Sequence, residues 1–256
     1  MIVLLTDFGF SHYVGILKGV IARLAPGCPV IDLAHDIAPQ DVRDGAWLLF
    51  ASYRHFPPGA VFCAVVDPGV GGDRQALVIR TRRYLFVGPD NGLLLPAAED
   101  DGLTSAWALP RSLEACRTFE GRDVFAPAAA RLAAGADPAS LGRPSEPGTV
   151  LRFHRCGREG EVVHIDRFGN VVTNIPPVPG AGAYRLSSGG GTLDLPYHPS
   201  YSGGRYGEPM LTTGSADTLE IAVPAGSAWE RLRPFFALSV GTRVKLESLG
   251  PQERGE

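Results

Sequence analysis

Short apolar runs alternate with amphipathic segments through the first half of the chain. Ile2–Thr6, Val30–Ala34 and Val61–Val66 are apolar runs bounded by turn-forming residues, which predicts buried strands. Between them, Tyr13–Leu24 and Gly45–Phe56 repeat their hydrophobic positions at helical spacing. An order of strand, helix, strand, helix, strand predicts parallel pairing with right-handed crossovers.

The same half continues with further elements. Asp41 is placed to cap the second helix, and Ala76–Thr81 and Tyr84–Val87 are spaced as a hairpin-like pair of strands. Gly121–Leu132 has the pattern of another helix, which Gly135 would end.

The pattern changes beyond Gly142, where glycine, proline and short β-type runs dominate. Turn signals separate these runs at fairly regular intervals, which predicts a small β-barrel or sandwich. Gly182–Gly191 and Ser200–Gly207 are expected to be glycine-rich surface loops. The expected strands are Glu161–Asp166, Val171–Ile175, Thr192–Leu195, Thr218–Val223 and Arg243–Leu249.

The change of pattern predicts two domains. We expect an α/β domain with a mostly parallel sheet over residues 1–143 and a smaller, all-β, barrel-like domain over residues 149–256. The segment 144–148, which contains two prolines and a glycine, is the expected linker.

Carboxylates follow two of the predicted strands. Asp7 ends the first strand, and Asp67 ends the third, before a glycine-rich turn that leads to Arg74. Ligands of open α/β sheets bind beyond the carboxyl ends of the strands. If the first and third strands are neighbours, Asp7 and Asp67 line one crevice. The alternative is that both carboxylates only cap turns or helices.

Three other polar clusters are open to two interpretations. Gly88-Pro89-Asp90-Asn91-Gly92 is foremost a turn sequence. Thr118–Asp123 precedes a helix, where it would face a polar ligand or supply a cap through Asp123. The segment Asp166–Asn170 lies between two β runs as a hairpin loop, although its Phe168 ring and Asn170 amide would also suit a purine.

Composition excludes several classes of protein. A net charge of −3 and scattered arginines give no basic patch, so we expect no nucleic-acid partner. The four cysteines form no C-x-x-C pair and the six histidines form no H-x-x-x-H pair, so we predict no metal. No apolar run is long enough to span a membrane, and no signal peptide is recognisable, so we expect a cytoplasmic protein without membrane attachment.

Taken in order, these motifs resemble the S-adenosyl-L-methionine (SAM) hydroxide adenosyltransferase family, relatives of the fluorinase and chlorinase. The likeness covers nearly the whole chain. It rests on the segments Thr6–Gly9, Tyr13–Gly15, Lys18–Ile21, Pro39–Val42, Val66–Gly71, Gly88–Gly92, Gly121–Asp123, Asp166–Asn170 and Leu219–Val223.

The resemblance implies an enzyme that converts SAM and water into adenosine and methionine. It implies no cofactor beyond the substrate, and a homotrimer whose sites lie between the N-terminal domain of one subunit and the C-terminal domain of the next. By position, Asp67 and Arg74 match two members of a catalytic Asp-Arg-His set. The implied substrate contacts are Asp7 for the ribose hydroxyls, Phe168, Asn170 and backbone near Ala225 for the adenine, and Ser215 for the methionine part.

The third catalytic position departs from the family, because Glu120 stands where the family has histidine. A glutamate can act as a base, but beside Asp67 it adds a second negative charge. The hydrolase is therefore the leading hypothesis. The alternatives are a SAM- or adenosine-binding protein without turnover, used for sensing or sequestration, and, less favoured, a SAM-dependent halide transferase.

Overall fold

The computed structural model describes residues 1–111 and 116–250, and the chain divides into two compact units, Met1–Leu151 and Arg152–Glu256. The segment 144–148, expected to be a linker, lies inside the first unit, and its beginning belongs to strand β7 (Arg143–Ser145). Pro144 of β7 pairs with Trp107 at the edge of a sheet, where a proline costs no ladder hydrogen bond on its outer side.

The first unit is built on a seven-stranded mixed sheet in the order β2-β1-β3-β5-β4-β6-β7. β2, β1, β3 and β5 run parallel to one another, β4 and β7 run in the opposite direction, and β6 returns to the direction of β5. The strands are β1 (Ile2–Thr6), β2 (Val30–Ala34), β3 (Val61–Val65), β4 (Ala76–Thr81), β5 (Leu85–Pro89), β6 (Leu103–Ala108) and β7.

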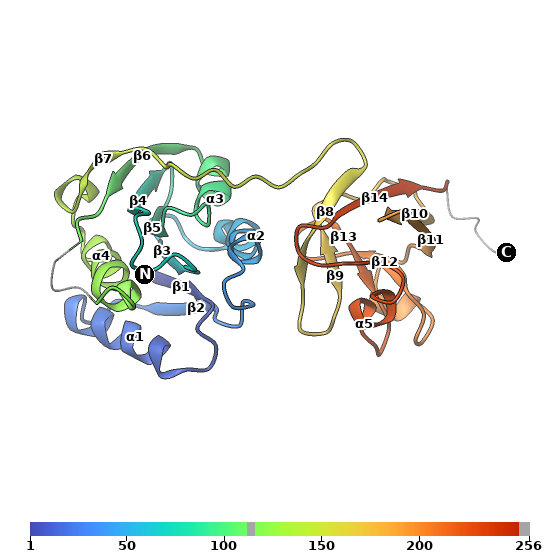
Figure 1. Cartoon of the computed structure of the whole chain (residues 1–256), viewed down its shortest axis with the longest axis horizontal. Helices are drawn as coiled ribbons and strands as arrows, with labels where there is room; N and C mark the ends of the chain where they lie inside the picture. Colours follow the sequence, from blue (N-terminus) through green and yellow to red (C-terminus); the bar gives the residue numbers. More distant parts are fainter. Residues whose placement is uncertain (112–115, 251–256) are drawn as a thin grey trace. The chain divides into compact units, whose positions relative to one another are not determined.

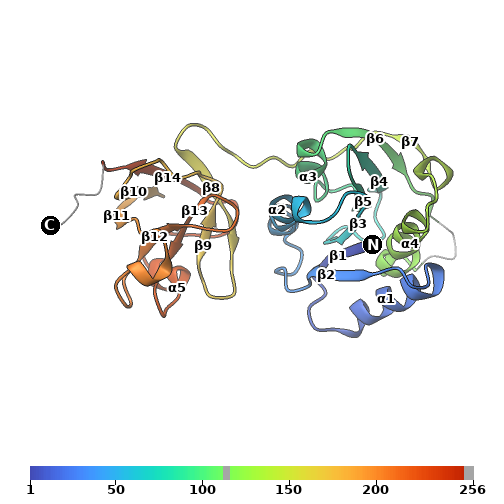
Figure 2. The ribbon, with the colours of Figure 1, turned by 180° about the vertical axis from the view of Figure 1, so that it is seen from behind.

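Helices cover both faces of this sheet (Figures 1 and 2). α1 and α4 pack together on one face, and α2 and α3 pack together on the other. Alternate residues of β1 serve the two faces, so that Ile2 and Leu4 join Leu17, Ile21 and Phe125 in one core cluster. The helices are α1 (His12–Leu24), α2 (Val42–Ser52), α3 (Leu95–Asp100) and α4 (Ala126–Ala133), with a π turn at Gly121–Phe125.

The predicted strands and helices of this unit are confirmed to within a few residues at their ends. The Asp41 side chain caps α2 by accepting a hydrogen bond of 2.9 Å from the backbone N–H of Asp44. α3, β6 and β7 were not predicted. α3 has only six residues, too few to show a period, and β6 carries Thr104 and Ser105 in place of an apolar run.

The second unit is an all-β, nearly closed antiparallel barrel. Its strand order is β11-β10-β14-β8-β9-β13-β12, and the bridge between Tyr197 and Leu211 joins the two edges. A short helix, α5 (Ala228–Leu232), packs into the barrel core. The strands are β8 (Glu159–Ile165), β9 (Val171–Thr173), β10 (Ala183–Ser188), β11 (Gly191–Pro196), β12 (Met210–Thr213), β13 (Leu219–Ala222) and β14 (Arg243–Ser248).

The expectation of a surface loop at Gly182–Gly191 is wrong, because β10 occupies most of it. Tyr184 and Leu186 alternate with polar residues and are fully buried in the barrel core. Gly189 and Gly190, with φ of +56° and +86°, form the two-residue turn into β11, which needs positive φ at both positions. The glycines of this segment therefore mark a hairpin turn.

Candidate active site

β1 and β3 are neighbours in the sheet, so the carboxylates that follow them lie at the same edge. Thr6 pairs with Val65 at the last position of the ladder, and Asp7 and Asp67 both line a pocket of about 200 Å³ just beyond it. The conditional expectation that these two side chains share a crevice is therefore confirmed.

The glycine-rich turn after β3 brings Arg74 back onto Asp67. Gly71 has φ of +77°, and a Cβ at this position would collide with the backbone carbonyl of Arg117. Only glycine allows both this backbone conformation and this close approach. The turn thereby packs directly against the segment that carries Glu120.

Arg74 joins two buried carboxylates. Its Nε donates to Asp67 Oδ1 at 3.0 Å, and its Nη2 donates to Asp67 Oδ2 and to Glu120 Oε2, the latter at 2.5 Å. The side chains of Asp67, Glu120 and Arg74 are 5%, 3% and 11% exposed. The guanidinium also lies over the Phe125 ring, 5.3 Å from its centroid. The three residues expected to form a catalytic set thus meet in one buried network.

A second arginine, which the sequence did not single out, completes this network. Arg111 follows β6, and its Nε forms an ion pair with Glu120 Oε1 at 3.0 Å. No motif marks Arg111, because its partner is nine residues away across a segment with no regular pattern. Two guanidinium groups therefore face two carboxylates.

Aromatic rings form another part of the pocket wall. Phe8, Tyr13 and Phe119 pack edge to face, with centroids 5.9 Å apart for Phe8 and Tyr13 and 5.0 Å apart for Tyr13 and Phe119. All three rings line the same pocket as Asp7, Asp67 and Glu120. Sequence reasoning missed this cluster, since each ring read alone is an ordinary core residue.

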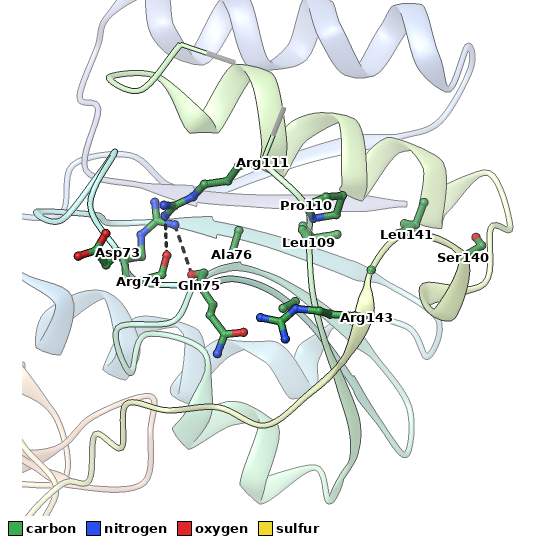
Figure 3. Close-up of a pocket in the computed structure, with 12 residues that line it drawn as sticks. Asp73, Arg74, Gln75, Ala76, Leu109, Pro110, Arg111, Ser140, Leu141 and Arg143 are labelled. Atoms are coloured by element: carbon green, nitrogen blue, oxygen red, sulfur yellow. Dashed lines mark hydrogen bonds between the residues drawn. The ribbon is translucent and has the colours of Figure 1, made fainter. Parts of the chain in front are cut away.

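The two arginines lie on the other side of the carboxylates. Arg74 and Arg111 line a separate cavity of about 600 Å³, together with Gln75 and Arg143 (Figure 3). The lining of the smaller pocket has three carboxylates and, among the described residues, no cation. That pocket therefore suits a positively charged group beside an aromatic or apolar body.

Backbone contacts hold the neighbouring loops. Asp7 Oδ2 accepts a hydrogen bond of 2.8 Å from the N–H of Gln40, whose φ is +69°. The Asn91 side-chain amide donates to the carbonyl of Val66 at 2.8 Å, directly before Asp67. Asp90 accepts from the N–H groups of Gly148 and Thr149. Gly88 and Pro89 therefore end strand β5, and the turn that follows, Asp90–Gly92, supports the end of β3.

The segment before α4 is held by Asp123. Its Oδ2 accepts a hydrogen bond of 2.8 Å from the N–H of Cys116, and Arg122 donates to both of its oxygens. The Arg122 guanidinium is the main reason that the pKa of Asp123 is lowered, and the Cys116 N–H adds to the effect. Asp123 therefore stabilises the loop between Cys116 and Asp123, whereas Glu120 of the same loop lines the pocket.

The remaining expected site residues belong to the second unit. The Phe168 ring is 70% exposed in this chain, and the Asn170 side chain donates to Asp166 Oδ2 at 2.9 Å. Ala225 has φ of +57° in the turn after β13. The helix α5 that follows this turn contacts the Asp166–Asn170 loop, since the Trp229 N–H donates to the Gly169 carbonyl. Ser215 is exposed in the turn between β12 and β13.

Residues 1–111 and 116–250 contain neither a candidate metal-binding cluster nor a membrane-spanning helix. This part of the chain holds no group of three or more His, Cys, Asp and Glu side chains arranged for a metal ion. It also contains no helix that is long and apolar enough to cross a membrane.

Comparisons with known proteins agree over most of the chain. A (R)-S-adenosyl-L-methionine hydrolase from Thermus thermophilus is 42% identical, over 94% of this chain and 97% of that protein. A fluorinase from Actinoplanes sp. is more distant, at 27% identity over 87% of this chain and 90% of that protein. A solved structure of a conserved protein from Thermotoga maritima matches with a TM-score of 0.88 and 35% identity, covering 96% of this chain and 100% of that one.

Models of one family match both units. The SAM hydroxide adenosyltransferase N-terminal domain matches residues 2–142, and the C-terminal domain of the same family matches residues 160–244. This chain belongs to the SAM hydroxide adenosyltransferase family.

Proposed function

We propose that this protein hydrolyses SAM to adenosine and L-methionine. The observation that carries the proposal is the pocket lined by Asp7, Asp67, Glu120 and three aromatic rings. SAM is a cation at its sulfonium, so carboxylates and ring faces attract it. Four curated relatives named as SAM hydrolases, from 36% to 45% identical, support the same reaction.

The reaction is an in-line displacement at the C5′ carbon. A water oxygen forms the new bond to C5′ while the C5′–S bond breaks. The electron pair of the broken C5′–S bond stays on sulfur, which becomes the neutral thioether of methionine. The water loses one proton to a carboxylate. Holding the water in line behind C5′ removes translational freedom, which contributes several kcal/mol.

Asp67 is the proposed proton acceptor. Both of its oxygens already accept a hydrogen bond from Arg74, but a carboxylate has about four lone-pair sites, so about two remain, and one of these can accept from water. Arg74 fixes the orientation of the Asp67 carboxylate through this bidentate contact. Glu120 accepts a hydrogen bond from Nη2 of the same arginine. It is the second carboxylate that can hold the water.

The substrate contacts are proposed from the family positions. Asp7 would bind the ribose hydroxyls, Phe168 and Asn170 the adenine with backbone near Ala225, and Ser215 the methionine part. Support comes from the contact between the loop that carries Phe168 and α5, which follows the turn that carries Ala225, and from the exposed Phe168 ring, which is free to stack on a base. No cofactor or metal is part of this proposal, and a cytoplasmic location remains a prediction.

The assay is incubation of purified protein with SAM, following adenosine and methionine by chromatography. Equal amounts of both products, lost in Asp67→Ala, are expected. Arg143→Ala is the matched control, since Arg143 lines only the larger cavity. Binding of SAM without products between pH 5 and pH 9 would contradict hydrolysis and leave a SAM-binding protein.

We also propose a homotrimer in which each site uses the first unit of one subunit and the second unit of the next. The exposed rings of Phe10, Phe168 and Tyr206 support an assembly that covers them. Mixing refolded Asp67→Ala and Asn170→Ala subunits tests the arrangement. Shared sites predict that the mixture regains part of the activity that each variant lacks, and no recovery in mixed trimers overturns it.

A further inference from the structure

Arg111 contacts three residues from two segments of the proposed active site at once. Besides its ion pair with Glu120, its Nη1 donates to the backbone carbonyl of Gly72 and its Nη2 donates to the carbonyl of Arg74 at 2.5 Å. Figure 3 shows the side chain reaching Arg74 from the segment that follows β6. One guanidinium therefore fastens the glycine-rich turn to the residue at position 120.

The charges of the network require such a residue. Asp67 and Glu120 are both nearly buried, and Arg74 supplies one positive charge to the pair through a shared nitrogen. A neutral histidine at position 120 would need no further cation. A glutamate there leaves one buried negative charge in excess, which is costly unless it is paired. Arg111 restores a balance of two carboxylates and two guanidinium groups.

We infer that Arg111 is a positioning residue of the proposed hydrolysis, acting as the counter-charge that allows a carboxylate to be buried at position 120. The inference rests on the proposed function. By holding Glu120 Oε1 and the turn together, Arg111 keeps Arg74 directed at Asp67, so that Asp67 remains aligned on the water. Arg111 does not line the pocket that holds the carboxylates, and its action is indirect.

The inference predicts that the effect of Arg111 depends on residue 120. Arg111→Ala is expected to lower kcat roughly tenfold or more, with a much smaller change in KM, because a buried carboxylate loses its partner. In the Glu120→His background the same substitution should change kcat less than about threefold, since the excess charge is gone. An equal loss of kcat in both backgrounds overturns the inference and shows that Arg111 has only a structural role.

Arg111→Lys separates charge from geometry. A lysine keeps the positive charge, but it lacks the planar guanidinium group that lets arginine donate to Glu120 and to two backbone carbonyls at once. A kcat between those of the wild type and Arg111→Ala is expected. A kcat as low as that of Arg111→Ala would contradict the role of charge. Arg143→Ala is the control, because Arg143 lines the same cavity but is not among the residues that contact Asp67 or Glu120 in the network.

The larger cavity allows a direct rescue experiment. Arg111 lines this space of about 600 Å³ and its side chain is 34% exposed, so a guanidinium ion can enter the place that Arg111→Ala vacates. Guanidinium, at concentrations far below those that unfold the protein, should raise kcat of Arg111→Ala and leave the wild type unchanged. Sodium chloride at equal ionic strength is the control. No rescue, together with a normal fold by circular dichroism, counts against the inference.

The two proposals fail in different ways. If the wild type makes no adenosine, the proposed hydrolysis fails. Urea unfolding of the wild type, Arg111→Ala, Glu120→His and the double variant then measures the coupling of residues 111 and 120 without turnover. Additive effects on the free energy of unfolding overturn the counter-charge, and a clear coupling supports it.

Discussion

A single nitrogen, Nη2 of Arg74, joins Asp67 and Glu120, although Arg74 and Glu120 lie 46 positions apart in the chain. The shared contact makes the two carboxylates one unit, because neither can move without disturbing the guanidinium that holds the other. The geometry of Asp67 therefore depends on residues from three separate segments: the turn after β3, the segment before α4 and the segment after β6.

The first prediction concerns the two-pronged contact of Arg74 with Asp67. Asp67→Asn should lower kcat about 100-fold or more, because an amide cannot accept the proton of water at neutral pH. Arg74→Lys should lower kcat roughly tenfold, because lysine keeps the charge but loses the planar fork that fixes the carboxylate. Steady-state adenosine formation measures both. A larger loss for Arg74→Lys than for Asp67→Asn would contradict Asp67 as the acceptor.

The second prediction concerns halide. Arg74 and Arg111 balance two of the three carboxylates that line the smaller pocket, so the negative charge that a chloride ion meets there is that of Asp7, whereas water meets no repulsion. Incubation with SAM and excess chloride should yield adenosine and no 5′-chloro-5′-deoxyadenosine, as measured by chromatography with mass detection. Formation of the chlorinated nucleoside at a rate near that of adenosine would overturn this view of the pocket. Sodium sulfate at equal ionic strength controls for screening.

The third prediction concerns Gly71. Gly71→Ala places a Cβ against the Arg117 carbonyl at a positive φ, so the free energy of unfolding should fall by about 2–4 kcal/mol. Gly59→Ala is a matched control, since Gly59 also has positive φ, +86°, but open space around it. It should cost about 1 kcal/mol. Urea unfolding compares the two, and equal losses would show that backbone strain alone matters at Gly71.

The fourth prediction concerns Glu220 in the second unit. Burial raises the pKa of Glu220 and the nearby Asp166 adds to this, while the Tyr201 hydroxyl, which donates to Glu220, opposes it. A carboxyl whose pKa is raised by folding contributes stability below its ordinary pKa and loses it as the pH rises through the raised value. Glu220→Gln should therefore lessen the loss of stability with rising pH.

Urea unfolding midpoints measured from pH 4 to pH 8 check this effect. The exposed Glu208 supplies the control, and Glu208→Gln should follow the wild-type profile. A Glu220→Gln profile that parallels the wild type over the whole range would show that ionisation of Glu220 does not limit stability.

Local patterns determined much of this fold. β1 and β3 are apolar runs ended by a carboxylate, and α1 and α2 show a helical period, so their existence and type follow from the sequence alone. The positions of Asp7 and Asp67 at one edge follow from the parallel order of such strands. The strand ends and the glycine-rich turn are determined by residues close together in sequence, so they can be predicted without knowing the tertiary structure.

Only the tertiary structure decided the elements and contacts that depend on distant partners. β10 is a strand because Tyr184 and Leu186 fill the barrel core, although glycines on either side suggest a loop. No local sequence pattern marks Arg111 as a site residue. Its role follows from its contacts with the buried Glu120 and with the turn after β3. The physical reason is that burial and charge pairing act between residues far apart in sequence, whereas turn and period signals act between neighbours.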